Sequence, residues 1–134
     1  MPDEDIIERF HDRYSRPTSE AALIVEREVI GANVGANGYT TLAQAEALIG
    51  ELRLGPGLRL LDLGAGRGWP GLHLARQSGC DVVLADVPAP GLAAAVRRAD
   101  EWGLTQRTLF VRAAGQQLPF APDTFDAVVH TDTL

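Results

Sequence analysis

The sequence predicts an α/β domain built on a doubly wound parallel sheet, with helices preceding it. Two observations support this fold class. From residue 58 onward, short apolar runs alternate with segments of helical periodicity, and the first run ends in a glycine-dense turn that leads into a helix. The chain has 134 residues, 46% of them hydrophobic, and a formal net charge of −6, which suits one acidic domain with a modest core.

The N-terminal stretch differs in composition from the remainder. Residues 1–28 hold 8 acidic residues, 4 arginines and no glycine. Asp3 is a suitable cap for a first helix that Pro17 ends, and a second helix is predicted over 19–30 with Gly31 at its C-terminus. We expect this stretch to be helical.

The elements that follow are read from capping signals and apolar runs. Thr41 and Gln44 have capping-box spacing and open a helix whose apolar side chains share one face. Right-handed crossovers then favour one sheet topology. Strands are predicted over 58–63, 80–86, 107–113 and 125–131, and helices from the glycine turn to 77 and over 91–102.

The glycine turn fits two classes of ligand. Gly66, Gly68 and Gly71 satisfy the G-x-G-x-x-G pattern of dinucleotide-binding folds, and Asp86 lies 18 residues beyond Gly68, where such folds place an acid for the ribose. Glycines here let the backbone adopt positive φ and approach a ligand closely. A dinucleotide is therefore one reading of the turn.

The second reading starts from an acid within the strand. Asp62 precedes Gly64, Gly66 and Gly68 in the pattern D-x-G-x-G-x-G. A carboxylate at this position opposes a pyrophosphate, but it suits an amino-acid ligand that carries an ammonium and a sulfonium. The same turn is therefore also compatible with a cationic ligand.

Three motifs in order resemble the class I S-adenosylmethionine-dependent methyltransferases, in particular the small-molecule, methyltransferase type 11-like group. They are LLDLGAGRG (60–68), VVLADV (82–87) and QLPFAPDTFDAVVHTDTL (117–134). The resemblance covers about residues 38–134 and implies a Rossmann-like sheet of strand order 3-2-1-4. It also implies that residues 1–37 form a helical lid segment and that the sheet is incomplete, as in a chain truncated after strand four.

The resemblance assigns roles to the residues of these motifs. Asp62 supports the turn, Asp86 accepts hydrogen bonds from both ribose hydroxyls of S-adenosyl-L-methionine, and Val87 lies beside the adenine. The residues implied to line the amino-acid part of this cofactor are Gly64, Gly66 and Gly68.

Other positions leave alternatives open. The family often has an acid for the adenine amino group where this chain has Ala114, so either the backbone of Ala114 and Gly115 or the Gln116 side chain is the expected substitute. Tyr39 either contacts the cofactor carboxylate or packs beside the following helix. His130, at the C-terminal end of the fourth strand, is either a substrate-side catalytic base or a loop residue in contact with water or cofactor.

The implied function is methyl transfer from S-adenosylmethionine to a small-molecule acceptor by in-line displacement. Two alternatives remain: a non-catalytic cofactor-binding or interaction fragment of such an enzyme, and an NAD-dependent oxidoreductase. The latter rests on the overlapping glycine pattern alone.

Several functional classes are disfavoured. All 12 basic residues are arginine and the net charge is acidic, so we expect no nucleic-acid partner, and no apolar run is long enough for a membrane span. We expect no metal site, because His11 and His73 lack a second ligand at helical spacing.

Two further expectations concern the setting of the protein. The lone Cys80 cannot form an internal disulfide and no signal peptide is evident, which predicts a cytoplasmic protein. The apolar fourth strand is predicted to lie at the edge of the sheet, where it favours self-association.

Overall fold

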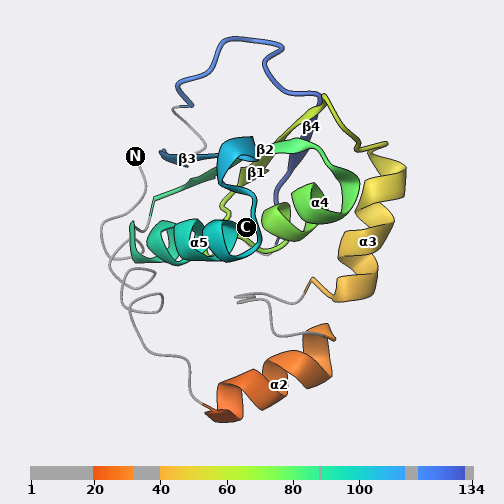
Figure 1. The fold of residues 1–134 in the computed structure, drawn as a ribbon, viewed down its shortest axis with the longest axis vertical. Coiled ribbons are helices and arrows are strands. Elements are labelled where there is room, and N and C mark those ends of the chain that lie inside the picture. The colour runs from red at the N-terminus through yellow and green to blue at the C-terminus, as the bar shows by residue number, and fades with distance from the viewer. Residues whose placement is uncertain (1–19, 32–39, 88, 114–117, 132–134) are drawn as a thin grey trace.

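A four-stranded parallel sheet forms the centre of the protein. The structure is a computed structural model that describes residues 20–31, 40–87, 89–113 and 118–131. The strand order is β3-β2-β1-β4, which confirms the predicted 3-2-1-4 order and the Rossmann-like fold class (Figure 1). The strands are β1 (Arg59–Leu63), β2 (Asp81–Asp86), β3 (Thr108–Arg112) and β4 (Ala127–Val129).

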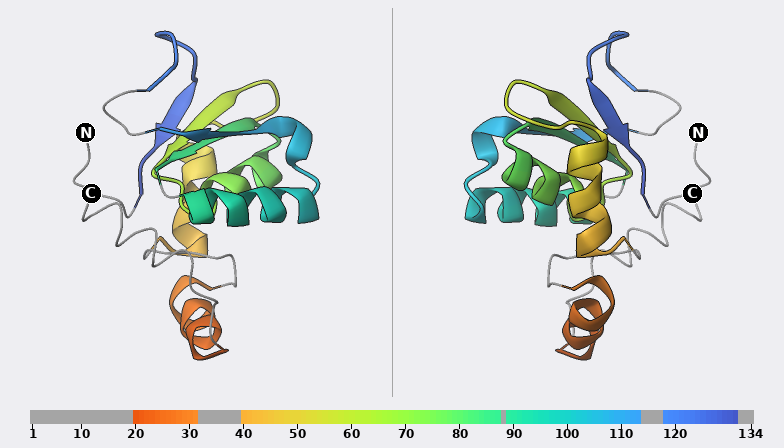
Figure 2. Two further views of the ribbon diagram at one scale, coloured as in Figure 1. Left: turned by 90° about the vertical axis from the view of Figure 1, so that its left-hand side faces the viewer. Right: turned by 90° about the vertical axis from the view of Figure 1, so that its right-hand side faces the viewer.

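The helices of the α/β part lie on one face of this sheet. Figure 2 shows α3, α4 and α5 on the same side of the strands, with α2 set apart from them. None of the described helices is long and apolar enough to cross a membrane. The helices are α2 (Glu20–Ile30), α3 (Leu42–Glu51), α4 (Gly71–Ser78) and α5 (Ala89–Glu101), with a 3₁₀ turn, η1, at Thr105–Arg107.

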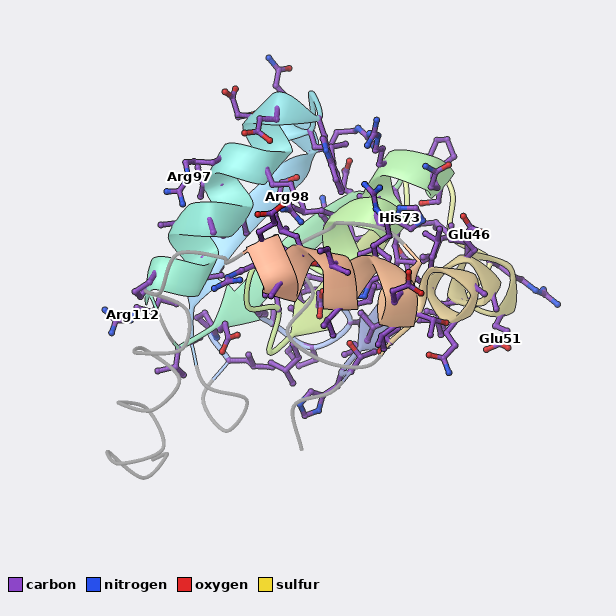
Figure 3. The ribbon with its side chains drawn as sticks, turned by 90° about the horizontal axis from the view of Figure 1, so that it is seen from below. Glu46, Glu51, His73, Arg97, Arg98 and Arg112 are labelled. Carbon is purple, nitrogen blue, oxygen red and sulfur yellow. The ribbon has the colours of Figure 1, made fainter. Side chains whose placement is uncertain are left out.

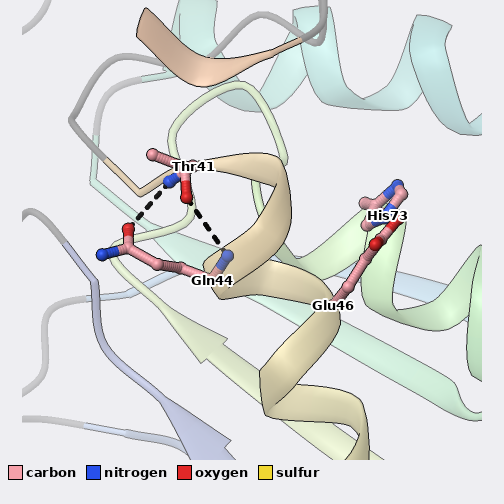
Figure 4. Close-up of polar contacts among 4 residues, drawn as sticks. All are labelled: Thr41, Gln44, Glu46 and His73. Atoms are coloured by element: carbon pink, nitrogen blue, oxygen red, sulfur yellow. Dashed lines mark hydrogen bonds and ion pairs between the residues drawn. The ribbon is translucent and has the colours of Figure 1, made fainter.

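Sequence signals explain where these helices begin and end. Thr41 caps α3: its hydroxyl accepts from the Gln44 backbone N–H at 3.1 Å, and the Gln44 side chain accepts from the Thr41 N–H at 2.9 Å, as the capping-box spacing predicts (Figure 4). Gly79 ends α4 in the left-handed conformation with φ 83°. The helix predicted after Asp3 lies outside the described residues.

Alternation along the strands divides the sheet into two unlike faces. Leu60, Val82 and Leu84 point into the helical layer and are completely or almost completely buried. The register places Leu109, Val83, Leu61 and Val128 in one row across all four strands, on the opposite face. The two ends of this row are exposed, Leu109 by 55% and Val128 by 54%, so the described part of the chain leaves this face partly open.

The fourth strand is shorter than predicted. It spans 3 residues where the apolar run suggested 125–131. Its ladder with β1 pairs Leu60, Leu61 and Asp62 and goes no further. Before the ladder, Asp126 is held by two bonds to Arg59: its N–H donates to the Arg59 carbonyl at 2.9 Å, and its carboxylate accepts from the Arg59 N–H at 2.8 Å.

Candidate functional site

The glycine turn joins β1 to α4 at the carboxyl edge of the sheet. Gly64, Gly66 and Gly68 all have positive φ, at 77°, 54° and 96°, so each uses the left-handed region that favours glycine. A Cβ at Gly68 would lie 2.5 Å from Leu72 Cδ1, which shows how closely the turn approaches the helix. The Ala85 carbonyl accepts from the N–H groups of Gly64 and Ala65, at 2.8 and 3.1 Å, which fixes the turn beside the end of β2.

Asp62 lies beneath this turn and is 1% exposed. Its Oδ2 accepts from the Gly71 N–H at 2.9 Å, while its buried Oδ1 has no hydrogen-bond partner among the described residues. Burial is the main reason why the pKa of Asp62 is raised from 3.8 to about 7; the Gly71 bond opposes this shift and the charge of Asp86 adds to it. The turn therefore covers a carboxylate with one oxygen still available.

Gly71 is explained by its close contact with this carboxylate. A Cβ at Gly71 would lie 2.5 Å from Asp62 Oδ2 and 2.8 Å from Leu84 Cδ2, so only glycine lets α4 begin this close to β1. A pyrophosphate binds to free N–H groups at a helix N-terminus, but the Gly71 N–H already donates to an acid. The sequence suggested the glycine through its spacing and missed its partner.

Asp86 ends β2 at the rim of the turn. Its Oδ2 accepts from the Gly66 N–H at 2.7 Å and its Oδ1 from the Val87 N–H at 2.8 Å. Burial raises the pKa of Asp86, and the two backbone bonds and the neighbouring His130 lower it. Each carboxylate oxygen retains acceptor capacity for a ligand hydroxyl.

The structure brings together only some of the predicted site residues. Asp86, Val87 and the turn are contiguous, and His130 is exposed after β4 but close enough to influence the Asp86 carboxylate electrostatically. Three predicted residues, Tyr39, Ala114 and Gly115, lie outside the described part of the chain.

A second contact to the turn was not anticipated from the sequence. The Trp69 indole, 7% exposed, donates its Nε1–H to the Thr40 carbonyl at 2.9 Å. An aromatic residue directly after a glycine turn is compatible with core packing or with shielding a ligand from water. No sequence pattern indicated its hydrogen-bond partner, Thr40, 29 positions earlier.

His73 is in α4, and its side chain faces Glu46 of α3 (Figures 3 and 4). His73 Nε2 is 3.8 Å from Glu46 Oε1. The ring centroids of His73 and Trp69 are 5.2 Å apart. Burial lowers the pKa of His73 below 6.5, with Glu46 opposing and Arg76 adding to the shift. Across the described ranges, no group of three or more His, Cys, Asp or Glu side chains is arranged to hold a metal ion.

Comparison with known proteins identifies the family. The family model described as "Methyltransferase domain" matches residues 60–134, which is more than half of the chain. The chain belongs to the methyltransferase domain family. The match begins in β1 and includes the glycine turn, Asp62 and Asp86, so the resemblance inferred from these motifs is confirmed.

Individual relatives are similar over this same part. Methyltransferase GfsG of Streptomyces halstedii is 37% identical over 83 residues, which are 62% of this chain and 30% of that protein. A SAM-dependent methyltransferase from Geobacter sulfurreducens, solved in complex with S-adenosyl-L-homocysteine, is 29% identical with a TM-score of 0.61, covering 72% of this chain and 38% of that one. The chain thus spans about a third or less of the curated relatives' length.

A more extended structural likeness concerns the fold alone. Geranyl diphosphate C-methyltransferase from Streptomyces coelicolor A3(2) aligns with 97% of this chain and 56% of its own, at a TM-score of 0.72 and 20% identity. This alignment agrees with the strand order and the helical layer described above.

Proposed function

We propose that this chain binds S-adenosyl-L-methionine and that the protein transfers the methyl group to a small-molecule acceptor. The observation that carries the proposal is the pair of carboxylates around the glycine turn, with Asp62 buried beneath it and Asp86 at its rim. Relatives named as methyltransferases support the same conclusion.

The two carboxylates and the glycine turn fit this cofactor. A cationic amino-acid ligand near the unpartnered Oδ1 of Asp62 would favour the ionised carboxylate, whereas a pyrophosphate would be repelled by it. Asp86 would accept from the ribose hydroxyls with the lone pairs that Gly66 and Val87 leave open. The residues proposed to line the rest of the cofactor are Gly64, Gly66 and Gly68 at the amino-acid part, Tyr39 at the carboxylate, and Val87, Ala114 and Gly115 at the adenine.

The bound cofactor supplies an activated methyl group with a good leaving group, so the chain's own task is to bind, align and exclude water. No nucleophilic side chain is required. A base is needed only for a poorly nucleophilic acceptor, and we assign that role to His130, which is exposed on the same edge as Asp86.

Calorimetric titration with S-adenosylhomocysteine tests the proposal. We expect binding by the wild type and at least about a tenfold loss in Asp86→Ala, the equivalent of about 1.4 kcal/mol. Asp81→Ala is the matched control, since Asp81 is exposed at the opposite end of the same strand, and it should bind as the wild type does. Equal affinity in Asp86→Ala contradicts the site, and binding of NAD instead favours the oxidoreductase.

Turnover separates an enzyme from a binding fragment. We expect His130→Ala to lower the rate of methyl transfer, at saturating S-adenosylmethionine, to an acceptor that must lose a proton. Binding without any methylated product, in trials with small-molecule acceptors, favours a non-catalytic cofactor-binding fragment.

We further infer that residues 1–37 act as a lid over the domain formed by 38–134. The compositional break supports this division, as do the α2 helix set apart from the sheet and the α3 cap at Thr41. Limited proteolysis tests it: S-adenosylhomocysteine should slow cleavage between the two parts. Cleavage at an unchanged rate contradicts the lid.

Self-association through β4 is also proposed. Along the described residues β4 pairs with β1 on one side only, and Val128 is 54% exposed on the open sheet face. Sedimentation equilibrium should give a mass that rises with concentration, and Val128→Asp should abolish this rise while Val96→Asp, on exposed α5 surface, leaves it unchanged. A wild type that is monomeric throughout contradicts the proposal.

We place the protein in the cytoplasm. Cys80 is a free, buried thiol, and burial raises its pKa, so it has the features of a packing residue that needs no oxidising environment. Cell fractionation with an antibody against the chain tests this location.

A further inference from the structure

The Trp69 side chain links two parts of the molecule that are distant in sequence. Trp69 follows the last glycine of the turn, and its indole N–H reaches the backbone carbonyl of Thr40, immediately before α3. The donor to acceptor distance is 2.9 Å and the side chain is almost fully buried. The bond therefore sets the distance between the glycine turn and the chain entering α3.

The chain direction at this point is fixed from the other side as well. The capping box of Thr41 and Gln44 occupies the next residue's N–H and hydroxyl, so the backbone is restrained on the C-terminal side of the Thr40 carbonyl. The Trp69 ring in turn packs against His73 of α4, with the ring planes tilted by 45°. Neither partner of the bond is free to drift relative to the turn.

Packing alone does not require this bond. A phenyl ring would also fill an apolar space between α3 and α4, whereas the indole adds one buried donor that must find an acceptor. The acceptor it has found is the backbone carbonyl of Thr40, which the bond holds beside the residue that follows the glycine turn. The indole N–H therefore fixes the Thr40 carbonyl, which burial of the ring alone would not do.

We propose that Trp69 is a positioning residue: its indole N–H holds the backbone at Thr40 against the glycine turn, as one wall of the site that binds the methyl donor. This inference rests on the proposed function, since the turn is taken to bind S-adenosyl-L-methionine. Loss of the N–H should weaken the affinity for S-adenosylhomocysteine by about threefold to tenfold, the range that one net hydrogen bond provides.

The two tryptophans of the chain give a matched pair for the test. Trp102 directly follows α5, and the Arg76 and Arg98 guanidinium groups are 4.7 and 5.6 Å from its ring centroid. Titration of the full chain with S-adenosylhomocysteine should show weakened binding by Trp69→Phe and wild-type affinity in Trp102→Phe. In ¹H–¹⁵N spectra, the Trp69 indole resonance should shift on titration and the Trp102 resonance should not.

A second replacement separates positioning from folding. Benzothienylalanine keeps the bicyclic shape and lacks only the N–H, so its incorporation at residue 69 in the Trp102→Phe chain should reproduce the affinity loss with an unchanged urea midpoint. Wild-type affinity in this protein, or a Trp69 resonance that ignores bound S-adenosylhomocysteine, overturns the positioning role alone. A wild type that binds no S-adenosylhomocysteine overturns the proposed function and this role with it.

Discussion

Replacing Gly71 with alanine is the sharpest test of how the acid beneath the turn is held. The added Cβ would lie 2.5 Å from Asp62 Oδ2, 2.9 Å from Asp62 Cβ and 2.8 Å from Leu84 Cδ2, all shorter than real Cβ contacts. Because Asp62 and Leu84 are in the buried layer between β1, β2 and α4, neither can move into solvent.

The expected loss of folding stability in Gly71→Ala has two parts. Overpacking a close-packed interior costs about 1 to 3 kcal/mol. Moving α4 away to relieve it lengthens the 2.9 Å bond from the Gly71 N–H to the buried carboxylate, which costs about 1 to 3 kcal/mol more. We therefore expect Gly71→Ala to lower the free energy of unfolding by about 2 to 6 kcal/mol.

Urea unfolding followed by circular dichroism measures this change, with Gly50→Ala as the control. Gly50 is in α3 and a Cβ there meets nothing within 4 Å, so alanine should stabilise the helix by about 0.5 to 1 kcal/mol. The two glycine substitutions should thus shift the urea midpoint in opposite directions. A Gly71→Ala protein that unfolds at or above the wild-type midpoint would refute the close approach of α4 to Asp62.

Three further predictions concern single side chains. The pKa of Asp62 is about 7 in the folded state and 3.8 when it is unperturbed, so the free energy of unfolding should fall as pH rises between these values. Asp62→Asn should remove this pH dependence in thermal melts at a series of pH values. Equal pH dependence in the wild type and the variant contradicts the assignment. His73 should give a pH dependence of the opposite sign, because its pKa in the folded state lies below the ordinary 6.5. In thermal melts, wild-type stability should decline as pH drops below 6.5, and the stability of His73→Phe should decline less. Thr41→Ala removes the capping box and should cost about 1 kcal/mol in chemical denaturation, whereas Thr105→Ala, an exposed control, should stay within about 0.5 kcal/mol of the wild type.

Much of the fold was predictable because its signals are local. The capping box at Thr41 and Gln44 and the left-handed Gly79 are decided within a few residues of chain, and the structure has both. The strand order 3-2-1-4 was implied by the resemblance of the three motifs to the methyltransferases, and the structure has that order. The length of β4 was not predictable, because an apolar run states only which residues can pair, and the ladder with β1 stops at Asp62 and Val129 although β1 continues to Leu63.

The candidate site was predictable in its residues and less so in its contacts. The D-x-G-x-G-x-G pattern selected Asp62 and the glycines, and the end of β2 selected Asp86. The pattern does not contain the distances between elements. It therefore could not show that Asp86 accepts from the Gly66 N–H, or that a side chain at Gly71 would collide with Asp62.

The sequence by itself determined the fold class, the family and the position of the glycine turn, because periodicity, caps and motif spacing are properties of neighbouring residues. Tertiary structure alone decided which groups meet: the carboxylate of Asp62 with the N–H of Gly71, and the indole of Trp69 with the Thr40 carbonyl. It also decided protonation, since the raised pKa of Asp62 and the lowered pKa of His73 come chiefly from burial. Burial is set by packing between elements that are far apart in the chain, and no local pattern encodes it.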